Sequence, residues 1–208
     1  LKSGCGANPH TVRDVEGMLD AEGPELNPEQ RAAVRNAFTH SISLMTGGAG
    51  SGKTYAVSTI ASAAALLELN IVLAAPTGKA AKRLEQVVGH EASTIHRLLG
   101  FNGHTYSRDA ANPIEADILV VDEVSMVDVP LAWRLFQAVD LTRTAVVLVG
   151  DHNQLPPVGP GNLLRDLVKS RTVPTTVLTQ IIRQAGVLKA NSTAILSGEV
   201  RPTCETKN

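Results

Sequence analysis

The sequence has few aromatic residues and few cysteines for its length. Of its 208 residues, 3% are aromatic and two are cysteines, Cys5 and Cys204, which stand near opposite ends. Two cysteines without metal-ligand spacing exclude a disulfide-rich scaffold and a zinc cluster, and are typical of free thiols in a reducing compartment. With so few aromatic rings, a core must be built from aliphatic side chains.

Long apolar runs and a charge excess of either sign are also missing. No run approaches the roughly 18 apolar residues of a membrane span, and the N-terminal residues lack a signal-peptide core. We therefore expect a soluble, cytoplasmic chain with no membrane partner. The formal net charge is −1, so nucleic-acid binding would depend on a local basic patch rather than an overall basic field.

Short aliphatic runs alternate with helical patterns along most of the chain, in which 43% of the residues are hydrophobic. The runs predict strands within 41–50, 70–76, 116–123, 143–151 and 173–182, and helices within 25–38, 53–69, 78–88, 128–139, 162–170 and 189–199. This alternation predicts an α/β fold with a mostly parallel sheet and helices on both faces. Residues 1–25 are rich in Gly, Pro and charge, and are interpreted as a leader or the end of an upstream region.

One segment interrupts this alternation. Residues 99–112 lie between a predicted helix and a predicted strand, and they contain Asn102-Gly103, a strong hairpin-turn signal. We expect a small β-hairpin insertion here, with a plain surface loop as the alternative.

The stretch GGAGSGKT, residues 47–54, fits the phosphate-loop pattern, with Gly47, Gly52, Lys53 and Thr54 at the required spacing. Because a predicted strand precedes it and a predicted helix follows, its backbone N–H groups and the helix N-terminus would surround phosphate oxygens. Lys53 would reach the β- and γ-phosphates, and the Thr54 hydroxyl would hold Mg²⁺. The expected nucleotide-binding residues of this segment are Gly48, Ala49, Gly50, Ser51, Gly52, Lys53, Thr54 and Tyr55.

Two adjacent carboxylates follow another apolar run. The stretch ILVVDEVS places Asp122 and Glu123 at the carboxyl end of a buried strand, where α/β sheets bind ligands. Asp122 is suited to the Mg²⁺ shell and Glu123 to polarising an attacking water. Because neighbouring strand residues point to opposite sides of a sheet, we expect separate roles for them. A charged strand end facing solvent is the alternative.

A proline-bearing loop follows the next apolar strand, in VVLVGDHNQLPPVGPG. Gln154 stands directly before Leu155-Pro156-Pro157, so a rigid loop could hold its amide against a γ-phosphate and register the loss of that phosphate. Such coupling of nucleotide state to position is typical of a motor rather than a simple kinase. For Asp151, a role in capping this loop and a role in the site are equally open.

Seven motifs occur in a fixed order: LNPEQRAAV, GGAGSGKT, APTGKAAKRL, STIHRLLG, VVDEVSM, VGDHNQLPPVGPGNLLRDL and LTQIIRQ. Together they resemble the first motor domain of a RecD-like helicase, in the superfamily-one group that moves 5′→3′ on single-stranded DNA. The resemblance covers about residues 26–200 and implies a RecA-like P-loop NTPase fold, with motor domain 1A at 26–208 and a 1B-like hairpin at 99–112. It implies an ATP-dependent DNA helicase or translocase of repair, recombination or conjugation, with ATP and Mg²⁺ as cofactors.

The resemblance also implies individual roles. Thr54 and Asp122 would hold Mg²⁺, Gln154 would sense the γ-phosphate, and Arg183 would be an arginine finger, unless it is a surface residue. Gln30 would read the adenine edge, although it could instead close a capping box with Asn27. The expected catalytic residues are Lys53, Asp122, Glu123, Gln154 and Arg183.

Single-stranded DNA is the expected partner, and the resemblance implies contacts from Pro76, Thr77, Gly78, Lys79, Thr94 and His96. The helix that begins near Gly78 could present its N-terminus to a DNA phosphate. Lys82 and Arg83 lie nearby, but an ordinary solvated helix face is equally open for them. His96 could instead be packed or merely hydrogen-bonded, and for Phe101 and Tyr106 we prefer local packing to stacking on bases.

Superfamily-one motors close two RecA-like lobes over ATP, and no second lobe follows Arg183 in this chain. We expect a fragment whose second lobe lies on the same native polypeptide, so that residues 1–208 alone bind nucleotide weakly, hydrolyse it slowly and unwind nothing. Two other functions stay open, namely a nucleotide- or DNA-binding module without turnover and a phosphotransferase. The intact Lys53, Glu123 and Arg183 argue against the module, and Gln154 in its QLPP setting argues against the phosphotransferase.

Overall fold

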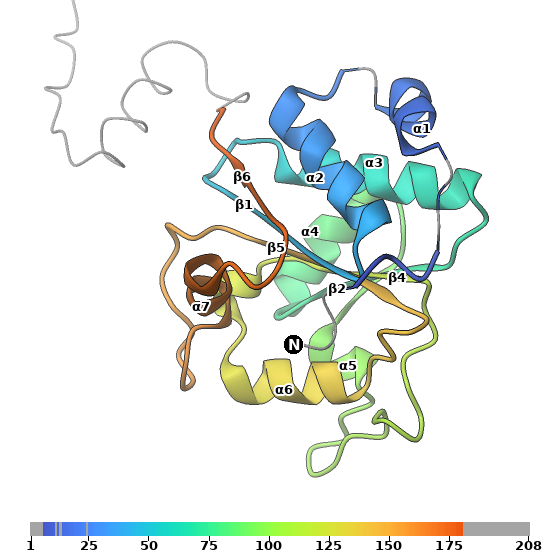
Figure 1. The fold of residues 1–208 in the computed structure, drawn as a ribbon. Coiled ribbons are helices and arrows are strands. Elements are labelled where there is room, and N and C mark those ends of the chain that lie inside the picture. Colours follow the sequence, from blue (N-terminus) through green and yellow to red (C-terminus); the bar gives the residue numbers. More distant parts are fainter. Residues whose placement is uncertain (1–5, 11, 13, 24, 181–208) are drawn as a thin grey trace, which may run out of the picture.

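A sheet of six parallel strands organises the part of the chain that the structure describes (Figure 1). The computed structural model describes residues 6–180 except 11, 13 and 24. The strands lie in the order β3-β2-β4-β5-β1-β6, and each neighbouring pair is parallel. Their bounds are Ile42–Gly47 for β1, Ile71–Ala75 for β2, Ala92–Thr94 for β3, Ile118–Val121 for β4, Ala145–Gly150 for β5 and Thr175–Leu178 for β6.

Helices cover both faces of this sheet. Helices α1 to α4 lie on one side of the sheet and α5 to α7 on the other (Figure 1), and the buried side chains form one core cluster on each side. Their bounds are Val15–Glu22 for α1, Pro28–Thr39 for α2, Lys53–Leu66 for α3, Gly78–Val88 for α4, Ile95–Leu98 for α5, Val129–Gln137 for α6 and Leu163–Ser170 for α7. The predicted α/β architecture with a parallel sheet between two helical layers is confirmed.

The strand β4 shows why these apolar runs are continuous. Ile118 and Val120 pack with the α1–α4 layer, whereas Leu119 and Val121 pack with the opposite layer. All four side chains are buried, because successive residues of a strand point to opposite faces and both faces are covered.

The beginning of α2 follows the sequence pattern closely. Asn27 Oδ1 accepts a hydrogen bond from Gln30 N at 2.9 Å, and Gln30 Oε1 accepts one from Asn27 N at 3.1 Å. This reciprocal pair is a capping box, and Pro28 occupies the first helical position, where its missing N–H costs nothing.

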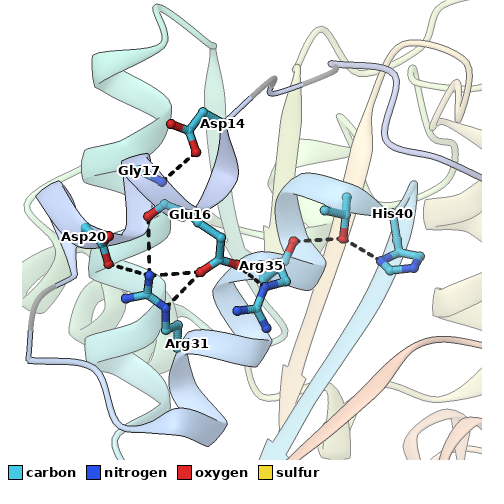
Figure 2. Close-up of polar contacts among 8 residues, drawn as sticks. Asp14, Glu16, Gly17, Asp20, Arg31, Arg35 and His40 are labelled. Atoms are coloured by element: carbon cyan, nitrogen blue, oxygen red, sulfur yellow. Dashed lines mark hydrogen bonds and ion pairs between the residues drawn. The ribbon is translucent and has the colours of Figure 1, made fainter.

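Residues 15–22 form a helix that the sequence patterns did not predict. Leu19 of α1 is fully buried in the same core cluster as side chains of α2 and α3. On the outer side, Glu16 and Asp20 of α1 meet Arg31 and Arg35 of α2 (Figure 2). The hydrogen bonds from Arg35 and Arg31 lower the pKa of Glu16 to about 2. Part of the predicted leader therefore packs on the domain, while the division at residue 25 stays a prediction.

Residues 99–112 form a loop rather than the expected two-stranded hairpin, so this prediction was wrong and the loop alternative holds. The loop contains one isolated antiparallel bridge, between Asp109 and Asn112. At the turn, Asn102 Oδ1 accepts hydrogen bonds from the backbone N–H groups of His104 and Thr105. Such local side-chain contacts satisfy the backbone without a ladder of paired strands.

Two short elements before this loop, β3 and α5, were not predicted either. Within the described part of the chain, no helix combines the length and apolarity needed to cross a membrane. The predicted helix at 189–199 and the predicted arginine finger Arg183 lie outside the described residues.

Candidate nucleotide-binding site

The phosphate loop, the carboxylate pair and the Gln154 loop follow β1, β4 and β5, which are neighbours in the sheet. Because parallel strands end at the same edge, the three segments meet there and, together with α4, line one cavity. The lining residues are Ala49, Gly50, Ser51, Gly52, Lys53, Thr54, Ala80, Arg83, Leu84, Asp122, Glu123 and Gln154. The structure thus brings together four of the five expected catalytic residues.

The phosphate loop depends on glycine at particular positions. Gly50 and Gly52 have φ angles of 80° and 85°, in the left-handed region that side chains disfavour. Gly47 lies so close to β6 that an added Cβ would stand 2.6 Å from the carbonyl oxygen of Leu178. Gly52 is the N-cap of α3 and offers no side chain, so the first N–H groups of this helix are open to an anion.

Lys53 lies at the first position of α3 and points back over the loop. Its Nζ donates hydrogen bonds to the carbonyl oxygens of Gly47 at 2.6 Å and Gly48 at 3.1 Å. Burial lowers the pKa of Lys53, while the nearby carboxylates of Asp151, Asp122 and Glu123 act in the opposite direction. The ammonium group of Lys53 is therefore partly desolvated and lies near carboxylates, and it could form a strong charge-assisted hydrogen bond with a phosphate oxygen.

Asp122 and Glu123 follow the end of β4 in a turn, so their side chains do not alternate between the two faces of the sheet as strand residues do. β4 ends at Val121, and Glu123 has a φ angle of 54°, a left-handed conformation that costs a non-glycine residue about 1–3 kcal/mol. Glu123 N donates a hydrogen bond to Asp122 Oδ1 at 2.8 Å. This turn directs both side chains into the same cavity, so the expectation that they point to opposite sides of the sheet was wrong.

The acidic pair fits a divalent cation. Burial is the main cause that raises the pKa of Asp122 to about 6, and the neighbouring charge of Glu123 adds to it. Glu123 Oε2 is buried and has no hydrogen-bond partner among the described residues. Two carboxylates and the Thr54 hydroxyl around one cavity are hard oxygen donors of the kind that Mg²⁺ prefers, and a cation would relieve the cost of burying these charges.

The loop after β5 is joined to the phosphate loop by contacts that the sequence did not reveal. Thr46, the residue before the loop, accepts a hydrogen bond from His152 N at 3.3 Å, and its Oγ1 lies 2.9 Å from His152 Nδ1. Asp151 is buried with 4% exposed, and its Oδ1 accepts a hydrogen bond from Asn153 N. Asp151 therefore caps the loop, and its negative charge favours the charged form of Lys53. A role for Asp151 in the site itself stays a prediction.

The expected sensor Gln154 extends from this loop toward the acidic segment. Its Oε1 accepts a hydrogen bond from Ser125 Oγ at 3.4 Å, and its own backbone N–H is held by the carbonyl oxygen of Asp151. Gln154 is otherwise exposed, which leaves its amide accessible from the cavity side.

Gln30, Gly48 and Tyr55 do not line the cavity. Gln30 is 1% exposed, and its Nε2 donates hydrogen bonds to the carbonyl oxygens of Ser51 at 3.5 Å and Gly52 at 3.3 Å, in addition to its capping box. Its amide thus supports the phosphate loop from behind, and recognition of adenine by Gln30 stays a prediction.

Arg83 is a cavity residue that sequence patterns did not assign to the nucleotide. It was grouped with Lys82 near the expected DNA segment, yet it lines the cavity together with Ala80 and Leu84 of α4. The signal that could have revealed it is the helical spacing of 80, 83 and 84, which places these residues on one face.

The two segments expected to contact DNA lie side by side. Pro76 follows β2, Thr94 ends β3, and Ala75 pairs with Thr94 in the sheet. Thr77 and Thr94 use their hydroxyls as helix caps, accepting hydrogen bonds from Ala80 N at 3.2 Å and Arg97 N at 3.1 Å. Gly78 and Lys79 are exposed in the first turn of α4.

His96, the remaining expected DNA contact, is exposed and packs against two aromatic rings. Its ring centroid lies 5.5 Å from that of Phe101 and 6.3 Å from that of Tyr106, and the two aromatic rings lie 4.7 Å apart. The preference for local packing of Phe101 and Tyr106 agrees with these contacts.

Residues 25–207 match the protein family described as AAA domain, and the chain belongs to this family. It is 42% identical over 160 residues to the ATP-dependent RecD2 DNA helicase of Deinococcus radiodurans, covering 77% of this chain and 22% of that protein. It is also 42% identical over 167 residues to the RecBCD enzyme subunit RecD of Mycolicibacterium smegmatis, covering 68% of this chain and 30% of that subunit. More particularly, the chain is a RecD-like superfamily-one motor domain, as the seven motifs implied, and it spans less than a third of these relatives.

Solved helicase structures share the fold. One is a structure described as the structural basis for DNA unwinding at forked double-stranded DNA by two coordinating Pif1 helicases. It has a TM-score of 0.59 and 25% sequence identity, and the match covers 85% of this chain and 49% of that one. The Pif1 helicase from Candida albicans has a TM-score of 0.55 and 22% identity, covering 87% and 49%, and this likeness bears on the fold alone. The RecA-like fold implied by the motifs is confirmed.

Proposed function

We propose that this chain is the ATP-hydrolysing motor lobe of an ATP-dependent DNA helicase or translocase that acts on single-stranded DNA, with 5′→3′ polarity as the RecD-like motifs imply. One observation carries the proposal: Lys53, Asp122, Glu123 and Gln154 come from three separate segments and line a single cavity. Each of these residue types matches one need of phosphoryl transfer, namely phosphate binding, metal binding, water activation and γ-phosphate sensing.

The phosphate loop and Lys53 bind the nucleotide in this proposal. Backbone N–H groups between Ala49 and Thr54, including the open N-terminus of α3, face the phosphates, and Lys53 exchanges its bonds to the Gly47 and Gly48 carbonyls for phosphate oxygens. Thr54 and Asp122 would hold Mg²⁺, which would supply positive charge to offset the negative charge of the phosphates.

Glu123 acts as the base for hydrolysis. A water oxygen forms a bond to the γ-phosphorus as the bond from that phosphorus to the β-phosphate oxygen breaks, and Glu123 takes the water proton. ADP and inorganic phosphate are the products. The buried, unpartnered Oε2 of Glu123 is suited to hold this water, because it has no competing donor among the described residues. Gln154 then reports the loss of the γ-phosphate to the loop after β5.

The DNA strand is proposed to run over the carboxyl ends of β2 and β3. There Pro76 directly follows Ala75, which pairs with Thr94 of β3, and the first turn of α4 supplies backbone N–H groups and one lysine, Lys79. Backbone contacts of this kind position a nucleic-acid strand without reading its sequence.

A second RecA-like lobe on the native polypeptide is proposed to close over the site, with Arg183 as an arginine finger. The cavity of about 130 Å³ is smaller than the roughly 300–1,000 Å³ of a complete small-molecule site, so it suits phosphates and a metal ion better than a whole nucleotide. Further protein is needed to enclose the nucleoside, and this chain spans only 22% of the RecD2 relative.

The test is ATP turnover of the full-length protein with and without single-stranded DNA. We expect DNA to stimulate turnover, and Glu123→Gln to lower kcat by roughly 10²–10⁴-fold while nucleotide still binds. Turnover that does not respond to DNA would contradict the motor. Nucleotide binding without any turnover in the unmodified protein would instead identify a binding module.

A further inference from the structure

The cavity contains a second cation besides Lys53. Arg83 lies on α4, a separate segment from the phosphate loop, and it lines the same cavity as Asp122 and Glu123. With Arg83 included, the ionisable groups that line the cavity are two cations and two carboxylates. Without it, the lining would carry an excess of negative charge, which opposes the binding of a triphosphate.

Helix geometry explains why Arg83 enters the cavity while Lys82 does not. Ala80, Arg83 and Leu84 share one face of α4, because residues three and four apart in a helix lie above one another. Leu84 is 1% exposed and anchors this face in the core. Lys82 is rotated by about 100° from Arg83 around the helix axis and does not line the cavity.

Arg83 has no competing partner. Within the described residues it makes no ion pair and no hydrogen bond, although the carboxylates of Asp122 and Glu123 line the same cavity. The positive charge of Arg83 nevertheless acts on both Lys53 and Asp122. It contributes to lowering the pKa of Lys53, and it opposes the rise in the pKa of Asp122. A free guanidinium beside these groups is available for a ligand anion.

We propose that Arg83 binds the terminal phosphate of ATP, so that α4 supplies a cation from within the same lobe. This inference rests on the proposed function, because it needs a nucleoside triphosphate in the cavity. A guanidinium presents a planar fork of N–H donors that matches two phosphate oxygens, and it keeps its charge at any working pH. Asp122 and Glu123, which are proposed to serve the metal and the attacking water, line the same cavity, so a phosphate that meets all three residues would be the γ-phosphate rather than the α-phosphate.

The consequence is a preference for ATP over ADP. A charge-assisted hydrogen bond contributes about 1.5–3 kcal/mol, so loss of Arg83 should weaken binding of a triphosphate by about 10- to 100-fold. Binding of ADP, which lacks the terminal phosphate, should change little. Turnover should also fall, because the guanidinium stabilises charge on the transferred phosphoryl group.

The experiment compares Arg83→Gln with Lys82→Gln in the full-length protein. The two substitutions remove one exposed cation each from adjacent positions of α4, and only Arg83 lines the cavity. Affinities for ADP and for a non-hydrolysable ATP analogue are measured by titration calorimetry with Mg²⁺, and affinity for a thymidine oligonucleotide by fluorescence anisotropy. Arg83→Lys is included because it keeps the charge and removes the planar fork.

Selective loss of affinity for the ATP analogue in Arg83→Gln, partly restored in Arg83→Lys and absent in Lys82→Gln, would support the assignment. Equal loss for ADP and the analogue would overturn it, because Arg83 would then contact another part of the nucleotide. Loss of DNA affinity alone would also overturn the assignment, because Arg83 would then be a DNA contact rather than a phosphate ligand. If the unmodified protein binds neither nucleotide, the proposed function itself fails, which is a distinct result.

Discussion

Replacing Asp122 by Asn should make the nucleotide-free protein more stable at neutral pH while removing its Mg²⁺-dependent activity. Burial raises the pKa of Asp122 from an ordinary value of 3.8 to about 6 in the folded state. Asparagine has nearly the same shape, and its carbonyl oxygen can still accept the hydrogen bond that Asp122 Oδ1 takes from Glu123 N at 2.8 Å. The substitution therefore removes the buried charge and keeps the local structure.

The pH dependence follows from linkage. Between about pH 4 and pH 6 the folded state holds a proton on Asp122 that the unfolded state has released, so the free energy of unfolding falls as pH rises through this window. Above pH 6 the folded protein carries the whole cost of the buried carboxylate. A difference of about two in pKa corresponds to about 3 kcal/mol, and solvent reaching the cavity reduces this to about 1–3 kcal/mol.

Urea unfolding followed by circular dichroism from pH 4 to pH 8 measures this effect. Asp122→Asn should match the unmodified protein near pH 4 and exceed it by about 1–3 kcal/mol at pH 7. Glu115→Gln, an exposed carboxylate just before the same strand, is the matched control and should show no such divergence. A constant difference across the pH range, or an Asn variant that is less stable at pH 7, would refute the reasoning. If Asp122 holds Mg²⁺ as proposed, Mg²⁺ with nucleotide should reverse the order, because Asp122→Asn removes one of the carboxylates that would bind the metal.

Three further outcomes are expected. Gly47→Ala should lower Tm and weaken nucleotide binding, with a cost of about 1–3 kcal/mol from the clash with the Leu178 carbonyl oxygen, and an unchanged Tm would contradict the close approach. Leu19→Ala should destabilise the protein by about 2–5 kcal/mol in urea unfolding, far more than Arg31→Ala, because only Leu19 is buried. Because the pKa of Glu16 is lowered from 4.5 to about 2, its stabilisation is fully present above pH 4.5 and is lost as pH falls through 2, so Glu16→Gln should lower Tm at pH 7 and have a much smaller effect at pH 2.

The sequence predicted those features that depend on neighbouring residues. The spacing of Gly47, Lys53 and Thr54 specifies a phosphate loop because the backbone turn and its charges are built from a single short segment. The capping box of Asn27 and Gln30 is equally local, since both partners lie within one helical turn. Apolar runs identified the long strands because burial on both faces makes most of their positions apolar, although β1 also buries Ser43 and Thr46.

Features that depend on distant segments were decided only in the tertiary structure. The sequence left Arg83 open between the DNA side and an ordinary solvated helix face, but the packing of α4 beside the phosphate loop makes Arg83 part of the cavity wall. Strand alternation separated Asp122 from Glu123, whereas the left-handed turn at Glu123 brings both into one site. The pairing of β2 with β3 places Thr94 beside Pro76, although 17 positions separate them in the chain. Local sequence patterns indicate the secondary structure that a segment favours. The direction in which a side chain points at a site also depends on the segments that pack against it, and these can be distant in the sequence.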